Sequence, residues 1–354
     1  MHGCVAHVDM AAFYVSVELQ RRPDLVGKSV VVAGSGPRAV VTTASYEARR
    51  FGVFSATPAA RARRLCPDAV FLQPDFRLYR ERSRAVMAGI RAHVDRVEVV
   101  GLDEAYLDLS GFERPKAAAR RVKAAIEHET GLGCSIGLGP SKLVAKVASD
   151  AEKPSGFVVL TREQACARFA GAAPALIPGI GPKTAARLAG QGIDTLGKLA
   201  AASEAVLISM FGPRLGPHLG RLARFEHESA VTPLRVAKSE SRETTFDHDL
   251  TGLHALSPVL ERLAAELCAT LDREERRGPT VGIKVRLDDF STHTRARTLD
   301  APTNDRSVVT EVALELLRDF DPPRPVRLLG VRVAGLDRAA DAGGPGDDQM
   351  ALAV

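Results

Sequence analysis

A single acidic residue stands where a buried strand is expected to give way to a buried helix near the start of the chain. The apolar run CVAHV (4–8) predicts a strand, and AAFYVSVEL (11–19) predicts a mostly buried helix. Asp9 lies between them, with no basic residue adjacent. An aspartate before a helix can be an N-cap, which accepts backbone N–H bonds at the positive end of the helix dipole. The alternative is a functional carboxylate at the end of a core strand.

A second pair of acidic residues, Asp103 and Glu104, lies in a short turn between apolar stretches in VEVVGLDEAYLDLS (97–110). Surface turns often carry acidic residues, but a turn between two buried strands directs its side chains to the edge of the sheet. If the strand that ends at Asp9 lies beside this hairpin, three carboxylates meet there, and their repulsion raises their pKa values unless a cation neutralises them. Mg²⁺ favours oxygen ligands, and two divalent ions about 4 Å apart promote phosphoryl or nucleotidyl transfer. The three carboxylates therefore predict a divalent-metal site.

Candidate ligands for a phosphate-bearing substrate occur in two further stretches. In TTASYEARRFGV (42–53), Tyr46 and Arg49 share a face of the expected helix, and Thr43 precedes them. Lys153 follows another expected helix in EKPSG (152–156). Each residue alone is typical of an ordinary surface, so only the combination supports a phosphate site.

The stretch IPGIGPKTAARL (177–188) predicts a helix that begins at Pro182, after a turn containing Gly179 and Gly181. Glycines expose backbone N–H groups at a helix N-terminus, which can bind a phosphate without reading a base. Lys183 and Thr184 add a cation and a hydroxyl. The pattern is that of a helix-hairpin-helix that holds a DNA backbone, and its alternative is a plain turn between two helices.

A chain of 354 residues is expected to form about two to four domains. Residues up to about 165 mix strands and helices, as in an α+β sheet with helices packed on it, and residues 166 to about 230 predict short helices. The polar stretch VAKSESRE (236–243) predicts a linker. From Thr244 the pattern follows the β-α-β-β-α-β order of a ferredoxin-like domain, and the final Gly-, Ala- and Asp-rich residues predict a disordered tail.

Two strands of this last domain carry alternating basic residues. In TVGIKVRL (280–287), Lys284 and Arg286 lie opposite the apolar face, and in HTRARTL (293–299), Arg295 and Arg297 share a face. Together they suggest a basic sheet surface that follows phosphates, although an ordinary solvated strand face explains them as well.

The overall composition excludes several classes of protein. The net charge is +5, which permits a polyanionic partner without requiring one. The five scattered cysteines contain no CxxC pair, which favours reduced thiols in a cytoplasm and disfavours a zinc site. The apolar runs are too short to span a bilayer, and no secretory signal is recognisable.

Five stretches occur in the order seen in Y-family translesion DNA polymerases, and the bacterial DNA polymerase IV branch is the most similar. They are HVDMAAFYVSVE, TASYEARRFGV, LDEAYLDLS, SKLVAKVASDAEKPSG and IPGIGPKTAARL. The resemblance implies an α+β, multidomain right-hand fold: a ferredoxin-like palm (1–10 and 77–165), fingers (11–76), a helical thumb with the helix-hairpin-helix (166–232), a linker (233–240), a little finger (241–336) and a tail (337–354). It also implies error-prone, template-directed addition of nucleotides with two Mg²⁺ ions, or Mn²⁺, and no proofreading, by a cytoplasmic, monomeric enzyme that binds primer-template DNA and dNTP and no membrane.

The resemblance also implies residue roles. Asp9, Asp103 and Glu104 match the metal-binding carboxylates, and the backbone of Met10 faces a metal. Thr43, Tyr46, Arg49 and Lys153 match positions that hold the incoming triphosphate, Tyr14 matches the steric gate against a ribose 2′-hydroxyl, and Phe13 lies under the nucleotide. Gly179 and Gly181 match the thumb hairpin. The chain departs from the pattern at Ala11, where a second acid is common, and at Ala12, where bulkier residues are frequent.

Two other functions remain open at this point: a catalytically silent scaffold at damaged DNA, and a nucleotide cyclase built on a similar palm. The first should have lost a carboxylate, and the second leaves the hairpin and the last domain without a role. The C-terminal residues Gln349, Met350, Leu352 and Val354 resemble the short peptide by which bacterial polymerases bind the sliding clamp, and the alternative is an apolar accident at a chain end.

Overall fold

A computed structural model of the chain describes residues 3–234 and 236–337, so the expected clamp-binding peptide lies outside the described residues. By its internal contacts the chain divides into two compact units, one mainly before residue 234 and one mainly after it. Within the described part, helices that are both long and apolar enough to cross a membrane do not occur.

The first unit is built on a five-stranded sheet in the order β5-β6-β1-β7-β8. Its central strand, β1 (Val5–Met10), is buried at all six positions, as its apolar sequence predicts. It pairs antiparallel with both β6 and β7, while β7 and β8 are parallel. The remaining strands are β5 (Val97–Val99), β6 (Glu104–Asp108), β7 (Cys134–Gly139) and β8 (Phe157–Val159).

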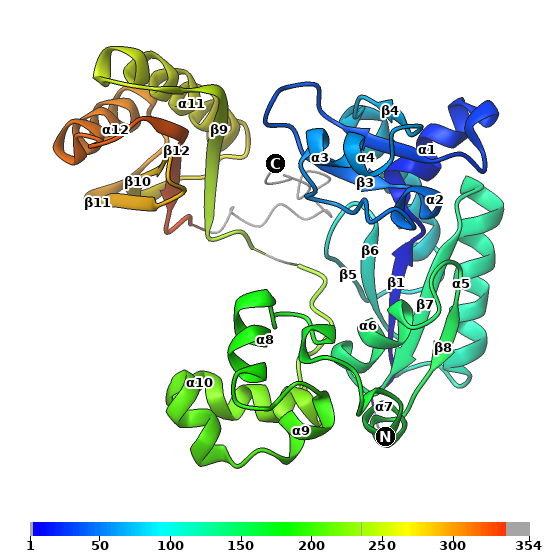
Figure 1. Ribbon diagram of the computed structural model, residues 1–354. Helices are drawn as coiled ribbons and strands as arrows, with labels where there is room; N and C mark the ends of the chain where they lie inside the picture. Colours follow the sequence, from blue (N-terminus) through cyan, green and yellow to red (C-terminus); the bar gives the residue numbers. More distant parts are fainter. Residues whose placement is uncertain (1–2, 235, 338–354) are drawn as a thin grey trace. The chain divides into compact units, whose positions relative to one another are not determined.

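Helices cover both faces of this sheet. The helix α6 (Lys142–Asp150) packs on the face that carries Asp9, and α4 (Phe76–Arg91) and α5 (Pro115–Thr130) lie on the opposite face (Figure 1). Gly137 of β7 lets α6 approach closely, because a Cβ there would meet the Ala145 carbonyl oxygen and the Ser149 backbone nitrogen well inside van der Waals distance. This close packing fixes how far the side chains of α6 reach over the sheet.

A smaller three-stranded sheet, in the order β3-β2-β4, belongs to the same unit. Its strands are β2 (Val30–Ala33), β3 (Val41–Ala44) and β4 (Val70–Leu72). The helices of this region are α1 (Phe13–Arg21), η1 (Pro23–Leu25), α2 (Tyr46–Arg49) and α3 (Ala59–Leu65). Since α1 begins only three residues after β1 ends, its first aromatic residues follow Asp9 closely.

The last part of the first unit is helical. It comprises α7 (Arg162–Phe169), η2 (Pro174–Leu176), α8 (Pro182–Ala189), α9 (Leu196–Ala201) and α10 (Glu204–Ala223), which is interrupted at Gly212. These helices share a hydrophobic core with one side of α6, to which Leu143 and Val147 contribute. The helix α6 is therefore held from two sides.

The second unit contains a four-stranded antiparallel sheet in the order β11-β10-β12-β9, with two helices on one face (Figure 1). Its elements follow the predicted β-α-β-β-α-β order: β9 (Ser239–Leu250), α11 (Leu253–Arg273), β10 (Gly278–Leu287), β11 (Thr292–Thr303), α12 (Arg306–Phe320) and β12 (Val326–Ala334). The strand β9 begins at Ser239, inside the stretch expected to be a linker, because its backbone pairs with β12 from Ser239 opposite Ala334 onward.

Candidate active site

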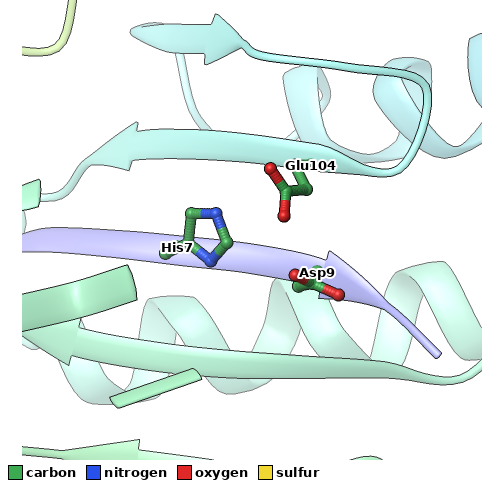
Figure 2. A group of neighbouring side chains, drawn as sticks. All are labelled: His7, Asp9 and Glu104. Atoms are coloured by element: carbon green, nitrogen blue, oxygen red, sulfur yellow. The ribbon is translucent and has the colours of Figure 1, made fainter. Parts of the chain in front are cut away.

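Two of the predicted carboxylates face each other across neighbouring strands. In the register of β1 and β6, Asp9 lies directly opposite Glu104, and both side chains project from the same face of the sheet (Figure 2). A carboxylate oxygen of each and a ring nitrogen of His7 all lie within 4.8 Å of one another. The expectation that the strand ending at Asp9 lies beside the hairpin is thus correct.

The third carboxylate, Asp103, lies in the turn just before β6. Its carbonyl oxygen accepts a hydrogen bond from the Met10 backbone N–H at 3.0 Å, so this turn is tied to the end of β1. Burial, together with the negative charge of Asp9, raises the pKa of Asp103 to about 6. The charge of Asp9 therefore acts on Asp103. Asp103 is nevertheless not part of the group formed by His7, Asp9 and Glu104, whose ligand atoms lie within 4.8 Å of one another.

The structure excludes the N-cap interpretation of Asp9. The N-cap of α1 is Ala12, which has no side-chain capping bond and adopts a left-handed conformation with φ 42°. Such a conformation is strained for a residue with a Cβ, and strained residues collect at functional sites. The sharp turn at Ala12 leaves the Asp9 carboxylate on the sheet and does not direct it to the helix end.

Two lysines that sequence analysis did not pair with Asp9 neutralise part of its charge. Lys146 of α6 places its Nζ 3.0 Å from Asp9 Oδ2 and 2.8 Å from Glu104 Oε1. Lys153 places its Nζ 2.7 Å from Asp9 Oδ2. Asp9 has no basic neighbour in sequence, but the fold brings these two basic partners to it. Lys146 lies on α6 and Lys153 lies three residues after the end of that helix, so no sequence spacing indicated that both would reach Asp9.

Asp9 and Glu104 face each other but have very different pKa values. Burial alone would raise the pKa of Asp9, but the charges of Lys146 and Lys153 and a hydrogen bond with Glu104 lower it to about 2. Burial and the hydrogen bond with Asp9 raise the pKa of Glu104 to about 7. The pair therefore carries one strongly held negative charge on Asp9 and a second carboxyl that is readily neutralised.

His7 is a further residue of the site that sequence analysis missed. Its ring is fully buried beside Tyr106, and its Nδ1 lies 2.8 Å from the Ser149 hydroxyl of α6. Its Nε2 has no hydrogen-bond partner among the described residues, and this edge of the ring faces Glu104 (Figure 2). Burial and the nearby positive charge of Lys146 lower the pKa of His7 to about 3, so the ring is neutral. His7 and Asp9 are two residues apart in β1, so their side chains project from the same face of the sheet. This spacing was the sequence signal that could have identified His7.

The candidate phosphate ligands fall into two groups. Thr43 is buried in β3. Tyr46 and Arg49 lie on the short helix α2, with the Arg49 guanidinium 4.6 Å from the centre of the Tyr46 ring. The Arg49 Nε also donates to the Ala44 carbonyl oxygen at 3.0 Å, which orients the side chain. Lys153 lies apart from them in sequence and contacts Asp9, as described above. The predicted shared face of Tyr46 and Arg49 is confirmed.

Tyr14 belongs to an aromatic cluster. Its ring stacks on Tyr79 with centroids 4.5 Å apart, contacts Phe76 edge-on at 6.1 Å, and lies 5.5 Å from the buried ring of Phe13. Tyr79 is anchored in turn, because its hydroxyl donates to the buried Glu18 carboxylate at 2.7 Å. Burial and the charge of Asp103 raise the pKa of Tyr14 to about 12, so its hydroxyl is neutral. The contacts with Tyr79, Phe76 and Phe13 hold its ring in place.

The predicted hairpin forms as expected. Gly179 has φ 92°, which side chains other than glycine rarely adopt, and Gly181 is the N-cap of α8 with Pro182 at its first position. Gly179, Gly181 and Lys183 are exposed, and Thr184 is half-buried. The first N–H groups of α8 lack partners within the helix, as in any α-helix, so this end can accept an anion.

The four basic residues of the second unit do not share one sheet surface, and that interpretation is wrong. Lys284 and Arg286 project from the open face, whereas Arg295 and Arg297 lie opposite Ile283 and Val281 and so project toward the helices. Arg295 lies over the Phe320 ring at 5.0 Å, and Arg297 pairs with Glu315 of α12. Alternation fixes the faces of each strand, but only the register between strands tells which faces coincide.

Comparisons with known proteins agree with this architecture. The impB/mucB/samB family matches residues 8–150, the C-terminal domain of that family matches residues 237–346, and a SAM-like helix-hairpin-helix tandem matches residues 175–216. A DNA polymerase IV of Methanoculleus marisnigri is 41% identical over 94% of both chains. A DNA polymerase IV of Streptomyces coelicolor is 42% identical over 94% of this chain and 71% of its own length.

A solved structure extends the comparison to the whole fold. It is a Y-family DNA polymerase chimera, Dbh-Dpo4(243-245)-Dbh, which superposes with a TM-score of 0.83 and 26% identity over 94% of this chain and 99% of the chimera. Identity near 40% along nearly the full length of several relatives, with both family domains matched, leaves one assignment. The chain belongs to the impB/mucB/samB family of Y-family DNA polymerases, in the DNA polymerase IV branch, and is a DNA-directed DNA polymerase of translesion synthesis.

Proposed function

We propose that Asp9, Asp103 and Glu104, with the Met10 carbonyl, hold two Mg²⁺ ions for error-prone nucleotidyl transfer without proofreading. The observation that carries this proposal is the register that sets Asp9 opposite Glu104, with Asp103 in the turn tied to Met10. The donor set fits the ion, because these groups offer hard oxygens and Mg²⁺ prefers carboxylates and phosphates to nitrogen. Two bound Mg²⁺ ions would supply the positive charge that stabilises an in-line displacement at a phosphate. Mn²⁺, which accepts the same ligands, is an alternative cofactor.

The nucleotide is then held from two sides. Thr43, Tyr46 and Arg49 on β3 and α2, and Lys153 after α6, offer hydroxyls and cations to the triphosphate of a dNTP. Support comes from the ordered Arg49 side chain and from the position of Lys153 beside Asp9. Phe13 and Tyr14 lie under the sugar, where the Tyr14 ring excludes a 2′-hydroxyl by contact.

Primer-template DNA is bound through its backbone. Gly179 and Gly181 expose the N-terminus of α8, with Lys183 and Thr184 beside it, so a phosphate is held by N–H groups and a cation. In the second unit, Lys284 and Arg286 on the open face of the sheet are candidates for phosphate contacts. Arg295 and Arg297 lie on the other face, where they contact α12.

The wider organisation follows the family. We infer a palm at residues 1–10 and 77–165, fingers at 11–76, a thumb at 166–232 and a little finger that begins near Ser239, where β9 starts. The enzyme acts as a cytoplasmic monomer that binds the sliding clamp through its C-terminal residues. The alternative of a silent scaffold has little support, because all three carboxylates are retained.

Charge-removing substitutions test the catalytic proposal. Asp103→Asn and Glu104→Gln should lower primer extension with four dNTPs and Mg²⁺ by about a thousandfold or more. DNA binding in a gel-shift assay should stay near wild type, because these residues contact no DNA backbone. Asp108→Asn, in the same strand, is the matched control and should extend primers normally. Extension near the wild-type rate by either catalytic variant would rule out the assignment.

A further inference from the structure

The ammonium group of Lys146 occupies the position between the two facing carboxylates. Its Nζ lies within 3.0 Å of oxygens of both Asp9 and Glu104, and only 17% of its side chain is exposed. The side chain starts from a helix that Gly137 allows to sit directly on β7, and the Ser149 hydroxyl donates to the Lys146 carbonyl oxygen at 2.8 Å. Backbone packing thus fixes the point from which the Lys146 side chain reaches the two carboxylates.

The oxygens that Lys146 contacts belong to the carboxylates proposed above to hold divalent ions. Asp9 Oδ2 forms ion pairs with the ammonium groups of both Lys146 and Lys153, and Glu104 Oε1 forms one with that of Lys146. A divalent ion and an ammonium cannot share the same oxygens at contact distance without strong repulsion. Either the ion binds more weakly than the carboxylates alone would bind it, or the ammonium moves.

A second acceptor lies within reach of the displaced group. Asp150, one turn further along α6, has Oδ2 at 3.4 Å from Lys146 Nζ and Oδ1 at 2.7 Å from Lys153 Nζ. Asp150 is exposed and is the last residue of α6. Because Asp150 already lies at ion-pair distance, the Lys146 ammonium would keep one partner if it moved away from Asp9 and Glu104.

We propose that Lys146 is an internal counter-ion that competes with divalent cations for Asp9 and Glu104, and that Asp150 accepts its ammonium when a divalent cation binds. The proposal rests on the metal assignment made above and adds a regulatory property to it. Lys146 keeps the carboxylate pair neutralised when metal is scarce, and it sets the metal concentration at which the site fills. Lys146 acts through Asp9 and Glu104 and is therefore a positioning residue.

The test measures Mg²⁺ binding by isothermal titration calorimetry on the full chain without DNA or nucleotide. Lys146→Met should bind Mg²⁺ about tenfold more tightly than wild type, because the competing charge is gone and the chain length is kept. Lys142→Met, which removes a lysine of the same helix that pairs with Glu98, is the matched control and should bind as wild type does. In EDTA, Lys146→Met should unfold at a lower temperature than wild type, and saturating Mg²⁺ should remove that difference. Unchanged or weaker Mg²⁺ binding by Lys146→Met would overturn the proposal.

A double-mutant comparison tests the role of Asp150. Asp150→Asn should weaken Mg²⁺ binding in the wild type and do so less in the Lys146→Met background, where Lys153 is the one remaining ammonium of this cluster that Asp150 pairs with. Equal weakening in both backgrounds would mean that Asp150 acts only through its charge, which overturns this part. Asp9→Asn separates the two levels of inference: if it leaves Mg²⁺ binding unchanged, the metal assignment itself fails. If it abolishes binding while Lys146→Met does not tighten it, only the counter-ion proposal fails.

Discussion

At the scale of single residues, the site depends on groups whose ionisation is displaced by burial. His7 is the clearest case, because its ring is enclosed between Tyr106 and Ser149 and stays neutral. Tyr14 is the second, since its hydroxyl is buried near Asp103 and its ring rests on Tyr79. Each of these two residues leads to a measurable expectation.

Acidification should destabilise the protein through His7. Burial lowers its pKa from 6.5 to about 3, so below pH 6.5 the unfolded chain binds a proton that the folded protein excludes. This contribution costs about 2 kcal/mol of unfolding free energy between pH 7.5 and pH 5. Asp103 and Glu104 have raised pKa values and act in the opposite direction over part of this range. The difference between wild type and His7→Gln, measured by urea unfolding in EDTA, isolates the histidine, and a pH-independent difference would contradict the expectation.

Removal of the Tyr14 ring should relax sugar selection. Tyr14→Ala should lower the ratio of kcat/KM for dNTP over rNTP by about a hundredfold, because contact with a 2′-hydroxyl is lost. Tyr14→Phe keeps the ring and its stack on Tyr79, so it should retain the wild-type ratio. Single-nucleotide insertion kinetics measure both. An unchanged ratio in Tyr14→Ala would assign sugar selection to another residue.

At the scale of elements, the position of α6 decides the geometry of the site. This helix supplies Lys146 and Ser149, and it is packed between the five-stranded sheet and the core of the helical part of the first unit. Its contact with β7 depends on Gly137, where there is no room for a side chain. The absence of a side chain at Gly137 therefore determines both how closely α6 packs on β7 and how far Lys146 extends over the sheet.

Gly137→Ala should lower the unfolding free energy by about 3 kcal/mol, because the new methyl group overlaps the backbone of α6. Gly111→Ala is the matched control. A Cβ at Gly111 meets no atom within 4 Å, so the change should stay within about 0.5 kcal/mol. Urea unfolding followed by circular dichroism measures both. Equal effects at the two positions would show that α6 does not rest on β7 as described.

The order of elements could be predicted from sequence where burial is periodic. In β10, Val281, Ile283 and Val285 alternate with polar residues, and this alternation alone identified the strand and its buried face. The start of β9 could not be predicted, because its polar residues are held by pairing with β12 and not by burial. The lysine contacts with Asp9 depend on packing between α6 and the sheet, which no local pattern encodes. The carboxylates were predictable because each interrupts an apolar stretch.

At the scale of the whole molecule, the carboxylates and the open basic face belong to different units. The first unit contains the carboxylates, the aromatic cluster and the hairpin, and the second contains the open face with Lys284 and Arg286. A polymerase gains from any tether that keeps it near DNA, since a tether raises the local concentration. The C-terminal residues are the candidate for such a tether.

Deletion of residues 349–354 should abolish stimulation by a loaded sliding clamp and leave single-nucleotide insertion on naked DNA unchanged. The reason is that a clamp-binding peptide would act through local concentration and would contribute no group to the reaction. Deletion of residues 343–348 shortens the same terminal segment but keeps the peptide, so it should preserve most of the stimulation. A chain that lacks 349–354 and is still fully stimulated would show that the clamp binds elsewhere.

The tyrosines described around the site have an optical consequence. The chain contains four tyrosines and no tryptophan, and Tyr14, Tyr46, Tyr79 and Tyr106 all lie in the first unit. The ultraviolet fluorescence of the protein therefore arises almost entirely from tyrosines at or near the carboxylates and the candidate phosphate ligands. The second unit contributes almost no fluorescence, because it contains neither tyrosine nor tryptophan. Ligand binding can be followed at the site without any label. A change in tyrosine emission that is complete while part of the circular dichroism signal remains would show that the first unit loses its structure first.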